Sequence, residues 1–444
     1  MANRLAKEKS TLVIGLAVFL VTFLVYVTSP VITSHDSRWS VHTSLSIIKE
    51  GNTDLNEYED LVRAINYNSV EYVGEDIYSL FPIGTSALAV PFVAVADALF
   101  EPLMAAFPNL ERWLVNRMAK AGVFIDDLEL INLHHAVELI IASFFCAVAA
   151  LFIFLVANAR LGLSQALLVV FVFAFCTSMW STSSRSLWQH GPSALMLSIV
   201  LYLMLLEEKA AGVIKYAAIP LALAFIIRPT NAIPIVFITL FIALNHRRQL
   251  VPFLLIALPL AAVFFAYNLH VYGSWLQPYY TPGRAFSPES FAQALAGNLI
   301  SPARGLLVYS PVLIFGALWI WNNRNSLSPN RPEVYLLAIV LSHWLLISSF
   351  PHWWAGHSYG PRFFADKLPF FIFFFVLFLQ DLRNRPGMKV TLVRALLIPL
   401  LAVSFFIHAK GAYHWPVHKW NITPTNIDHH PERLWDWQDV QFLR

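Results

Sequence analysis

The chain has 444 residues, of which 57% are hydrophobic and only 13% are charged, and its mean hydropathy is +0.59. Soluble domains carry about 25% charged and roughly 45–50% apolar residues, so this composition excludes an ordinary water-soluble protein and indicates one that lies in lipid. The formal net charge is +3, and the chain contains no basic run of the kind that nucleic-acid-binding proteins use.

The N-terminal segment is typical of a membrane anchor that stays attached to the chain. Arg4, Lys7 and Lys9 precede an apolar run over about 12–27. The run leads into residues 29–33 (SPVIT), which lack the small-residue pattern of a signal-peptide cleavage site. We therefore expect a first transmembrane helix whose basic N-terminus lies in the cytoplasm.

Further apolar runs recur along the chain, near the length of about 20 residues that a bilayer requires. They cover about 134–157, 163–180, 192–206, 212–227, 232–245, 251–270, 306–321, 333–350, 363–381 and 391–408. With the first run, the sequence predicts a single all-α domain, 1–444, of about eleven transmembrane spans. Cys146 and Cys176 both lie within such runs, so we expect neither a disulfide framework nor a metal site from them.

The positions of Lys and Arg orient these spans. With the N-terminus inside, the short inside loops contain basic residues, in agreement with the positive-inside rule; these loops are 158–162, 207–211, 246–250, 322–332 and 382–390. Residues 82–100 are apolar enough to cross, but a crossing there would turn every later basic loop outward. We therefore expect a re-entrant or interfacial helix within a long outside region, 30–133, which carries short interfacial helices. The C-terminal tail, 410–444, is then outside.

The first outside region contains the leading candidate for acid–base chemistry. Ionisable residues at membrane depth are costly, so those near a membrane boundary are candidates for function. Asp36 follows the first span closely, between His35 and Arg38. Partial desolvation there favours a carboxylate that acts as a general base. An interfacial ion pair with Arg38 is the structural alternative.

Basic and aromatic residues also gather in the later outside segments. Aromatic faces pack on the apolar faces of sugars, and guanidinium groups bind phosphate in a bidentate geometry. An alternative for any single arginine is contact with lipid headgroups. The candidates are His190 in loop 181–191, Arg228 in loop 228–231, Tyr279, Arg284 and Arg304 in loop 271–305, and His352, Trp354, His357, Tyr359 and Arg362 in loop 351–362. The spacing of His352 and His357 does not match a helical metal pair, so no metal is predicted.

The sequence contains no motif of a soluble, nucleotide-consuming enzyme. We find no P-loop, no dinucleotide-binding fingerprint after a strand and no nucleophile elbow. The energy for any group transfer on the outside must then arrive in a preactivated substrate, and a lipid-linked donor meets that requirement.

Four stretches carry a resemblance to a known superfamily. They are 78–92 (YSLFPIGTSALAVPF), 301–312 (SPARGLLVYSPV), 353–369 (WWAGHSYGPRFFADKLP) and the tail 431–444 (PERLWDWQDVQFLR). Together with the early acidic residue and the order of the spans, they resemble the GT-C superfamily of membrane glycosyltransferases. Within it the first three stretches are similar to the bacterial group that contains the lipid A aminoarabinose transferase and protein mannosyltransferases, and the tail resembles the ending of uncharacterised members.

The resemblance implies a polyprenyl-phosphate-linked sugar as donor, an acceptor (glycan, lipid or protein) on the outer face, and a bacterial inner membrane as location. It implies Asp36 as the base of an inverting displacement. The sequence departs from the family pattern here, because His35 precedes Asp36 and no paired acidic motif is present, so we expect no cofactor. Arg362, and less directly Arg304 and Arg228, would hold the donor phosphate. We expect further residues to contact the sugar or the acceptor: His35, Arg38, His190, Tyr279, Trp354, His357 and Tyr359.

Two other classes stay open at this point. The chain could be a lipid or oligosaccharide transporter (a flippase), although no clear internal repeat of the transporter kind is present. It could also be a membrane scaffold without catalysis, which would leave the aromatic and basic outside loops unexplained.

Overall fold

The computed structural model describes residues 2–33, 36–64, 69–107, 109–110, 112–113, 116, 129–280, 290–384 and 388–444. His35 and Arg284, both candidates from the sequence, lie outside the described residues. Helices dominate the chain. The longer ones are α1 (Ala2–Thr28), α6 (Glu129–Arg160), α7 (Leu163–Phe175), α8 (His190–Glu207), α9 (Ala218–Ile227), α10 (Ala232–Asn245), α11 (Arg247–Tyr272), α15 (Pro332–Ser348), α16 (Leu368–Asn384) and α17 (Met388–Tyr413).

The prediction of an integral membrane protein built from apolar helices is confirmed. Within the described residues, 7 helices are long and apolar enough to cross a membrane: Ser10–Thr28, Gly84–Ala106, His134–Arg160, His190–Glu207, Arg247–Tyr272, Arg362–Asn384 and Ala395–Tyr413. Shorter apolar helices of 10–17 residues accompany them: Leu163–Phe175, Val213–Ile227, Pro229–Asn245, Phe291–Ile300 and Pro332–Ser348. The count of eleven spans stays a prediction.

One predicted span is interrupted. The apolar run 306–321 forms a short helix α13 (Leu306–Tyr309) and a longer helix α14 (Ile314–Asn323), with a 3-10 turn at Pro311–Leu313 between them. Proline lacks a backbone donor and disfavours helical geometry in the residue before it, so Pro311 separates the two helices.

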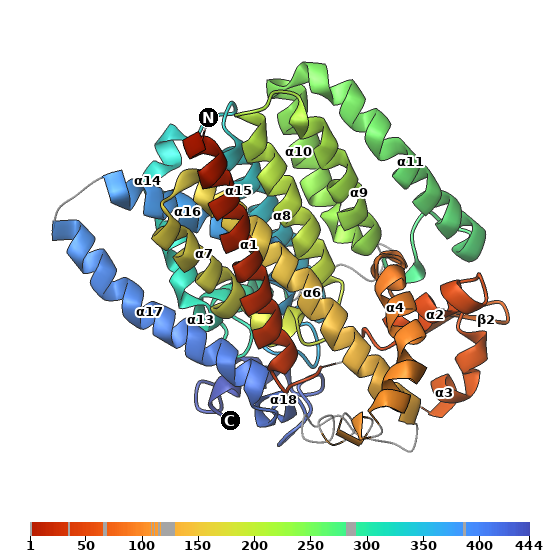
Figure 1. Cartoon of the computed structure of the whole chain (residues 1–444). Coiled ribbons are helices and arrows are strands. Elements are labelled where there is room, and N and C mark those ends of the chain that lie inside the picture. Colours follow the sequence, from red (N-terminus) through yellow and green to blue (C-terminus); the bar gives the residue numbers. More distant parts are fainter. Residues whose placement is uncertain are drawn as a thin grey trace.

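Helix α6 lies at the centre of the bundle and packs against α1, α7 and α8. Figure 1 shows α1 crossing in front of these helices, and it shows the N-terminus and the C-terminus at opposite ends of the molecule. Large apolar residues of α6, α8 and α16 fill the core between the helices, including Phe154, Leu197 and Phe373.

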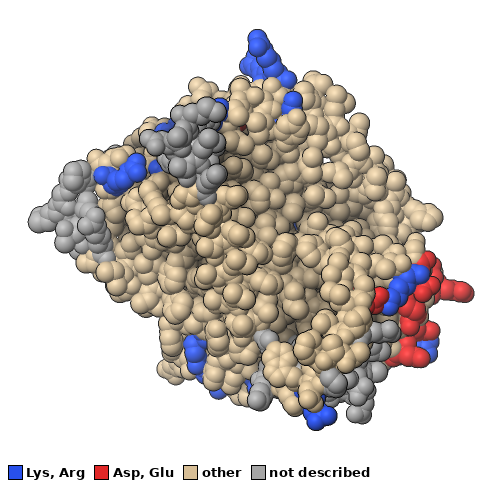
Figure 2. Space-filling view, in the orientation of Figure 1, with Lys and Arg blue, Asp and Glu red and all other residues tan. Residues whose placement is uncertain are grey.

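The outer surface of the bundle is suited to hydrocarbon. Helix α11 exposes Leu255, Leu258 and Val263 by 60–71%, and α1 exposes Leu12 and Leu16. On the face shown in Figure 2, Lys, Arg, Asp and Glu gather toward the two ends of the molecule and leave a broad uncharged band between them. An apolar surface of this extent has lipid as its natural partner.

The long first loop folds at the end of the bundle at which the C-terminus lies. It contains α2 (Trp39–Lys49), α3 (Glu59–Ala64), the antiparallel strands β1 (Val70–Val73) and β2 (Asp76–Ser79), and α4 (Gly84–Ala106). The expected short helices are therefore joined by a β-hairpin, which the all-α prediction did not include. Gly74 (φ +65°) supplies the positive φ that its two-residue turn requires.

The segment expected as a re-entrant or interfacial helix is the single helix α4. By length and composition it is able to cross a membrane, while Figure 1 shows it beside α2, toward the end that carries the hairpin. Its interfacial position stays a prediction. Gly84 begins it in direct contact with the end of α9, because a Cβ there would lie 2.5 Å from the carbonyl oxygen of Ile226. This close approach brings the start of α4 next to Arg228.

The C-terminal tail folds against the outside loops as a cap. It consists of α18 (Pro416–Lys419) and the 3-10 turns Pro431–Trp435 and Gln441–Leu443. Trp420 and Leu434 of the tail pack with Trp353 and Trp354 of the loop 351–362. Trp353 in turn lies against Gly297 of α12 (Phe291–Ile300), where a Cβ would approach the indole ring to 2.2 Å.

Candidate functional site

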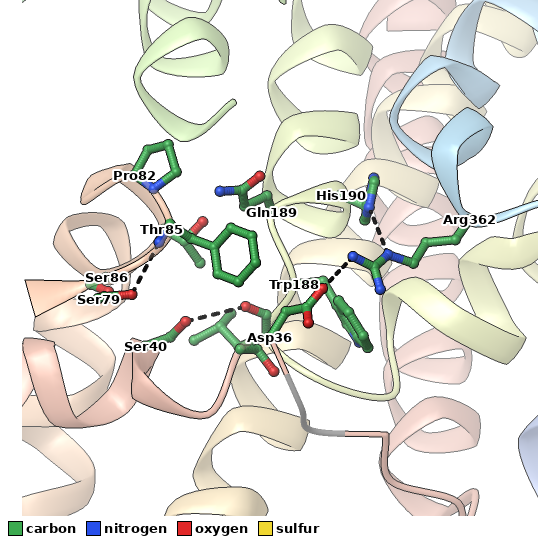
Figure 3. A pocket seen from close by; sticks show the side chains of 13 residues that line it. Asp36, Ser40, Ser79, Pro82, Thr85, Ser86, Trp188, Gln189, His190 and Arg362 are labelled. Atoms are coloured by element: carbon green, nitrogen blue, oxygen red, sulfur yellow. Dashed lines mark hydrogen bonds and ion pairs between the residues drawn. The ribbon is translucent and has the colours of Figure 1, made fainter. Parts of the chain in front are cut away.

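Asp36 and Arg362, 326 residues apart in the chain, form an ion pair at the centre of the candidate site. The guanidinium of Arg362 lies over the indole ring of Trp188, with its Cζ 3.9 Å from the ring centroid. Figure 3 shows the two charged groups facing each other, with His190 on the opposite side of the guanidinium. Both side chains are mostly buried, at 18% and 12% exposure. The pair is therefore shielded from bulk water but reachable by a ligand.

A fully buried carboxylate on α6 holds the two segments that carry Asp36 and Trp188. Glu138 accepts hydrogen bonds from Ser37 Oγ at 2.8 Å and from Ser186 Oγ at 2.7 Å. Each serine lies one or two residues from a site residue. Charge-assisted hydrogen bonds of this kind are about twice as strong as neutral ones. Because Glu138 makes both of them to serines of the two segments, we assign it to positioning these segments and not to binding the ligand.

His190 connects this pair to a deeper set of charges. Arg362 Nε lies 3.3 Å from His190 Nε2, and Arg228 Nη1 lies 2.8 Å from His190 Nδ1. The same Arg228 nitrogen donates to Asp366 Oδ1 at 2.9 Å. His190 begins α8, Arg228 follows α9, and Asp366 lies in the 3-10 segment Arg362–Lys367 that leads into α16. Three helix ends thus meet at one point.

Lys367 completes the buried network. Its Nζ donates to Asp366 Oδ2 at 2.7 Å and to Asn231 Oδ1 at 2.6 Å, and both charged side chains are 0% exposed. Among the described residues of this network, Arg228, Arg362 and Lys367 face two carboxylates, those of Asp36 and Asp366. The network therefore has one positive charge in excess when the histidine is neutral. Such an arrangement attracts an anion.

A cavity of about 640 Å³ opens beside these cations. Arg362, His190 and Arg228 line its polar side, while Tyr279, Tyr280 and Phe350 line its apolar side. Binding sites for small molecules have this character, with a mainly apolar wall and a few placed polar groups. A smaller recess adjoins it beyond the ion pair, and Phe81, Gln189, His190 and Arg362 line both.

Four sequence candidates lie elsewhere, in the loops 301–305 and 351–362 beneath the C-terminal cap. Arg304 is buried and donates to Trp354 O, Gly356 O, Ala303 O, Asn421 Oδ1 and Gln441 Oε1. Trp354 Nε1 donates to Asp428, Tyr359 Oη donates to Ile407 O, and His357 pairs with Asn426 and Asp428. None of the four lines either cavity at the Asp36–Arg362 pair. These contacts hold the two loops against the cap and α17, so we leave the four out of the proposed binding site.

Comparison of the chain with family models, with curated proteins and with solved structures found no match.

The structure brings six sequence candidates together around the two cavities: Asp36, Arg228, Arg362, His190, Tyr279 and His352. Arg38 begins α2 next to this group but lines neither cavity. Among the described residues, no group of three or more His, Cys, Asp or Glu is placed to hold a metal ion.

Sequence reasoning missed several residues of the site. Asp366 and Lys367 stand at the start of a phenylalanine-rich apolar run, and charges at such a position are a sign of function by themselves. Gln189 and Thr85, which line the smaller recess, are ordinary polar residues. No signal in a single sequence distinguishes them.

Proposed function

We propose that the chain is a glycosyltransferase of the membrane, which moves a sugar from a polyprenyl-phosphate donor to an acceptor hydroxyl at the outer face. The observation that carries this proposal is the ion pair between Asp36 and Arg362 beside a 640 Å³ cavity with aromatic walls. Arg362 is one of the three cations of the network, with Arg228 and Lys367. The excess positive charge suits a lipid phosphate, and the tyrosines suit a sugar ring. The resemblance to the GT-C superfamily agrees with this assignment.

In the proposed reaction, the donor phosphate takes the place of Asp36 beside Arg362. The freed carboxylate then accepts the proton of the acceptor hydroxyl. The hydroxyl oxygen forms a bond to the anomeric carbon as the bond from that carbon to the phosphate oxygen breaks. The electron pair of the broken bond leaves with the phosphate, whose charge Arg362 and Arg228 stabilise. The attack on the face opposite the leaving group inverts the anomeric configuration.

The same proposal fixes the orientation in the membrane. The site lies at the end of the bundle that carries the C-terminal cap, and the proposal places this end on the periplasmic side of a bacterial inner membrane. The N-terminus would then be cytoplasmic, in agreement with the basic loops at the other ends of the spans.

Native mass spectrometry of the detergent-purified protein tests the binding step. Wild type is expected to retain undecaprenyl phosphate, and Arg362→Ala is expected to lose it, because a desolvated phosphate loses its charge partner. Arg324→Ala, in the loop after α14, is the matched control and should retain the lipid. Equal retention by all three proteins, or bulk phospholipid only, contradicts the proposed binding site.

Asp36→Asn tests the chemical step. This variant is expected to retain the lipid phosphate while transfer of the sugar falls about 10²–10⁴-fold, the usual contribution of a general base. Asp97→Asn, in an exposed ion pair with Lys49, serves as the matched control. A transporter would move its lipid equally well with either substitution, so unchanged flipping by Asp36→Asn together with no detectable transfer by wild type would favour that alternative.

A further inference from the structure

The smaller recess beside the ion pair differs in character from the large cavity. Hydroxyl groups line it, from Ser40, Ser79, Thr85 and Ser86, and Asp36 and Arg362 form one side. Its volume is about 30 Å³. That space holds a water or two, or one small polar group, and is too small for a sugar ring.

Gln189 presents a fixed donor at the junction of the two cavities. The phenol of Tyr280 donates to Gln189 Oε1 at 3.1 Å, which determines the orientation of the amide. The amide nitrogen, Nε2, is buried and has no hydrogen-bond partner among the described residues. Figure 3 shows this side chain beside Pro82 and above the Asp36–Arg362 pair.

Thr85 presents a second unpaired group in the same recess. Its side chain is 3% exposed, and its Oγ1 has no partner in the described part of the chain. The neighbouring hydroxyls differ, because Ser40 Oγ lies 3.5 Å from Leu187 O and Ser79 Oγ accepts from the Phe81 N–H at 3.4 Å. Buried polar groups normally have partners, so two unpaired groups in one recess mark it as a place where a small polar group can bind.

We infer that Gln189 and Thr85 form a subsite for a single uncharged hydroxyl group on a narrow, unbranched substituent. The ligand is uncharged because Asp36 and Arg362, the charged residues that line the recess, are of opposite sign and give it no net charge. The substituent is narrow because the recess has room for one small group. This inference rests on the proposed function. The hydroxyl has two possible sources: the exocyclic hydroxymethyl group of the donor sugar, or the acceptor hydroxyl that meets Asp36.

Two matched lipids test the donor source. Undecaprenyl phosphate glucose and undecaprenyl phosphate xylose differ by one hydroxymethyl group, and bare undecaprenyl phosphate lacks the sugar. If the donor fills the subsite, wild type binds the glucosyl lipid roughly tenfold more tightly than the xylosyl lipid. Thr85→Val and Gln189→Leu should each bring this ratio close to one. Thr85→Val, whose residue lines only the smaller recess, should also leave the affinity for bare undecaprenyl phosphate unchanged.

Two small alcohols test the acceptor source. If the acceptor fills the subsite, both variants bind the glucosyl and xylosyl lipids like wild type. They then lose roughly tenfold in transfer of the sugar to methanol, and they also lose the preference for methanol over the bulkier 2-propanol. Thr43→Val is the control for both tests, because its hydroxyl is also buried and unpaired but lines neither cavity.

The outcomes distinguish a failure of the proposed function from a failure of the subsite alone. Wild type that retains no undecaprenyl lipid overturns the proposed function and, with it, the subsite. Wild type that binds undecaprenyl phosphate, with Thr85→Val and Gln189→Leu behaving like Thr43→Val in both tests, overturns the subsite alone. A change in either ratio that Thr43→Val does not share supports the subsite and names its source.

Discussion

The guanidinium of Arg362 stacks on the indole of Trp188 while it pairs with the carboxylate of Asp36. The aromatic ring holds the cation in one plane, with its nitrogens directed at Asp36 and His190. The arginine is thereby positioned before any ligand arrives, which lowers the entropy that binding has to overcome.

This relationship predicts a role for Trp188 in donor binding. Trp188→Ala should weaken retention of undecaprenyl phosphate by about 2- to 30-fold, which corresponds to a cation–π contribution of about 0.5–2 kcal/mol. Trp188→Phe should lose less. The pair Arg324 and Trp321, with Cζ 4.4 Å from the ring centroid, offers a matched control away from the site. If Trp321→Ala weakens retention as much as Trp188→Ala does, the stacking has no specific role.

Asp366 is expected to be essential for stability. Asp366→Ala leaves Arg228 and Lys367 buried beside each other without their shared counter-charge. Breaking a buried pair in this way costs about 3–5 kcal/mol. The double variant Asp366→Ala, Lys367→Met removes one of the stranded charges and should recover part of the loss. Thermal unfolding in detergent measures both effects, at a fixed scan rate because unfolding of membrane proteins is often irreversible.

The control for this prediction is an exposed ion pair. Asp97→Ala breaks the pair with Lys49, whose side chains are 52% and 38% exposed. Exposed pairs contribute about 0–1 kcal/mol, so the unfolding temperature should change little. An equal change for Asp97→Ala and Asp366→Ala would mean that the buried network does not stabilise the fold.

Arg304 is expected to hold the C-terminal cap rather than the donor. Burial lowers the pKa of Arg304 to about 10, and its hydrogen bonds join the loop 301–305 to the loop 353–356 and to Asn421 and Gln441 of the tail. Arg304→Ala should speed hydrogen exchange and proteolysis in 414–444. Arg304→Lys should do the same, because a lysine cannot supply the fork of donors. Loss of lipid retention with an unchanged cap would return Arg304 to the phosphate site.

His42 is expected to make stability depend on pH. Burial, followed by the electrostatic interaction with His134, lowers the pKa of His42 well below its ordinary value of 6.5. Its Nε2 lies 2.8 Å from His134 Nδ1, and its Nδ1 lies 3.0 Å from Arg38 O, so the folded state keeps the ring neutral.

The sign of the effect follows from proton linkage. Below pH 6.5 the unfolded chain binds a proton at His42 that the folded chain does not, so the stability contribution is full above pH 6.5 and is lost as the pH falls. The loss is about 1.4 kcal/mol for each pH unit until the folded-state pKa is reached. His42→Gln should flatten the dependence of the unfolding temperature on pH between 6.5 and 5. Parallel curves for wild type and variant would contradict this.

Much of the fold was predictable because hydrophobic length and the positive-inside rule act on local sequence. The run 134–157 predicted most of α6, and the run 251–270 predicted α11. The hairpin of β1 and β2 was not predicted, since residues 70–79 are mixed in polarity and too short for a clear period. The break at Pro311 was also missed, although a proline after a serine in an apolar run is a local signal for it.

The site was predictable only in part, because its parts come from distant segments. The topology placed Asp36, Arg228, Arg304 and Arg362 on one side of the membrane, but which loops touch depends on how the spans pack. Arg304 faces the cap, whereas Arg228 reaches the ion pair through His190. Gly84 illustrates the missing information. Its contact with Ile226 joins α4 to α9, and a single sequence does not show which helices touch.

The ion pair between Asp36 and Arg362 has a kinetic consequence. In the free protein the carboxylate that would act as base is held by the cation that would hold the donor. An acceptor that binds first finds the carboxylate of Asp36 already paired with Arg362, so its hydrogen bond to that carboxylate adds little binding energy. The lipid phosphate, by taking Arg362, releases the base for the second substrate. The substrates should therefore bind in a compulsory order, donor before acceptor, with the protein's own carboxylate acting as a competitor of the first.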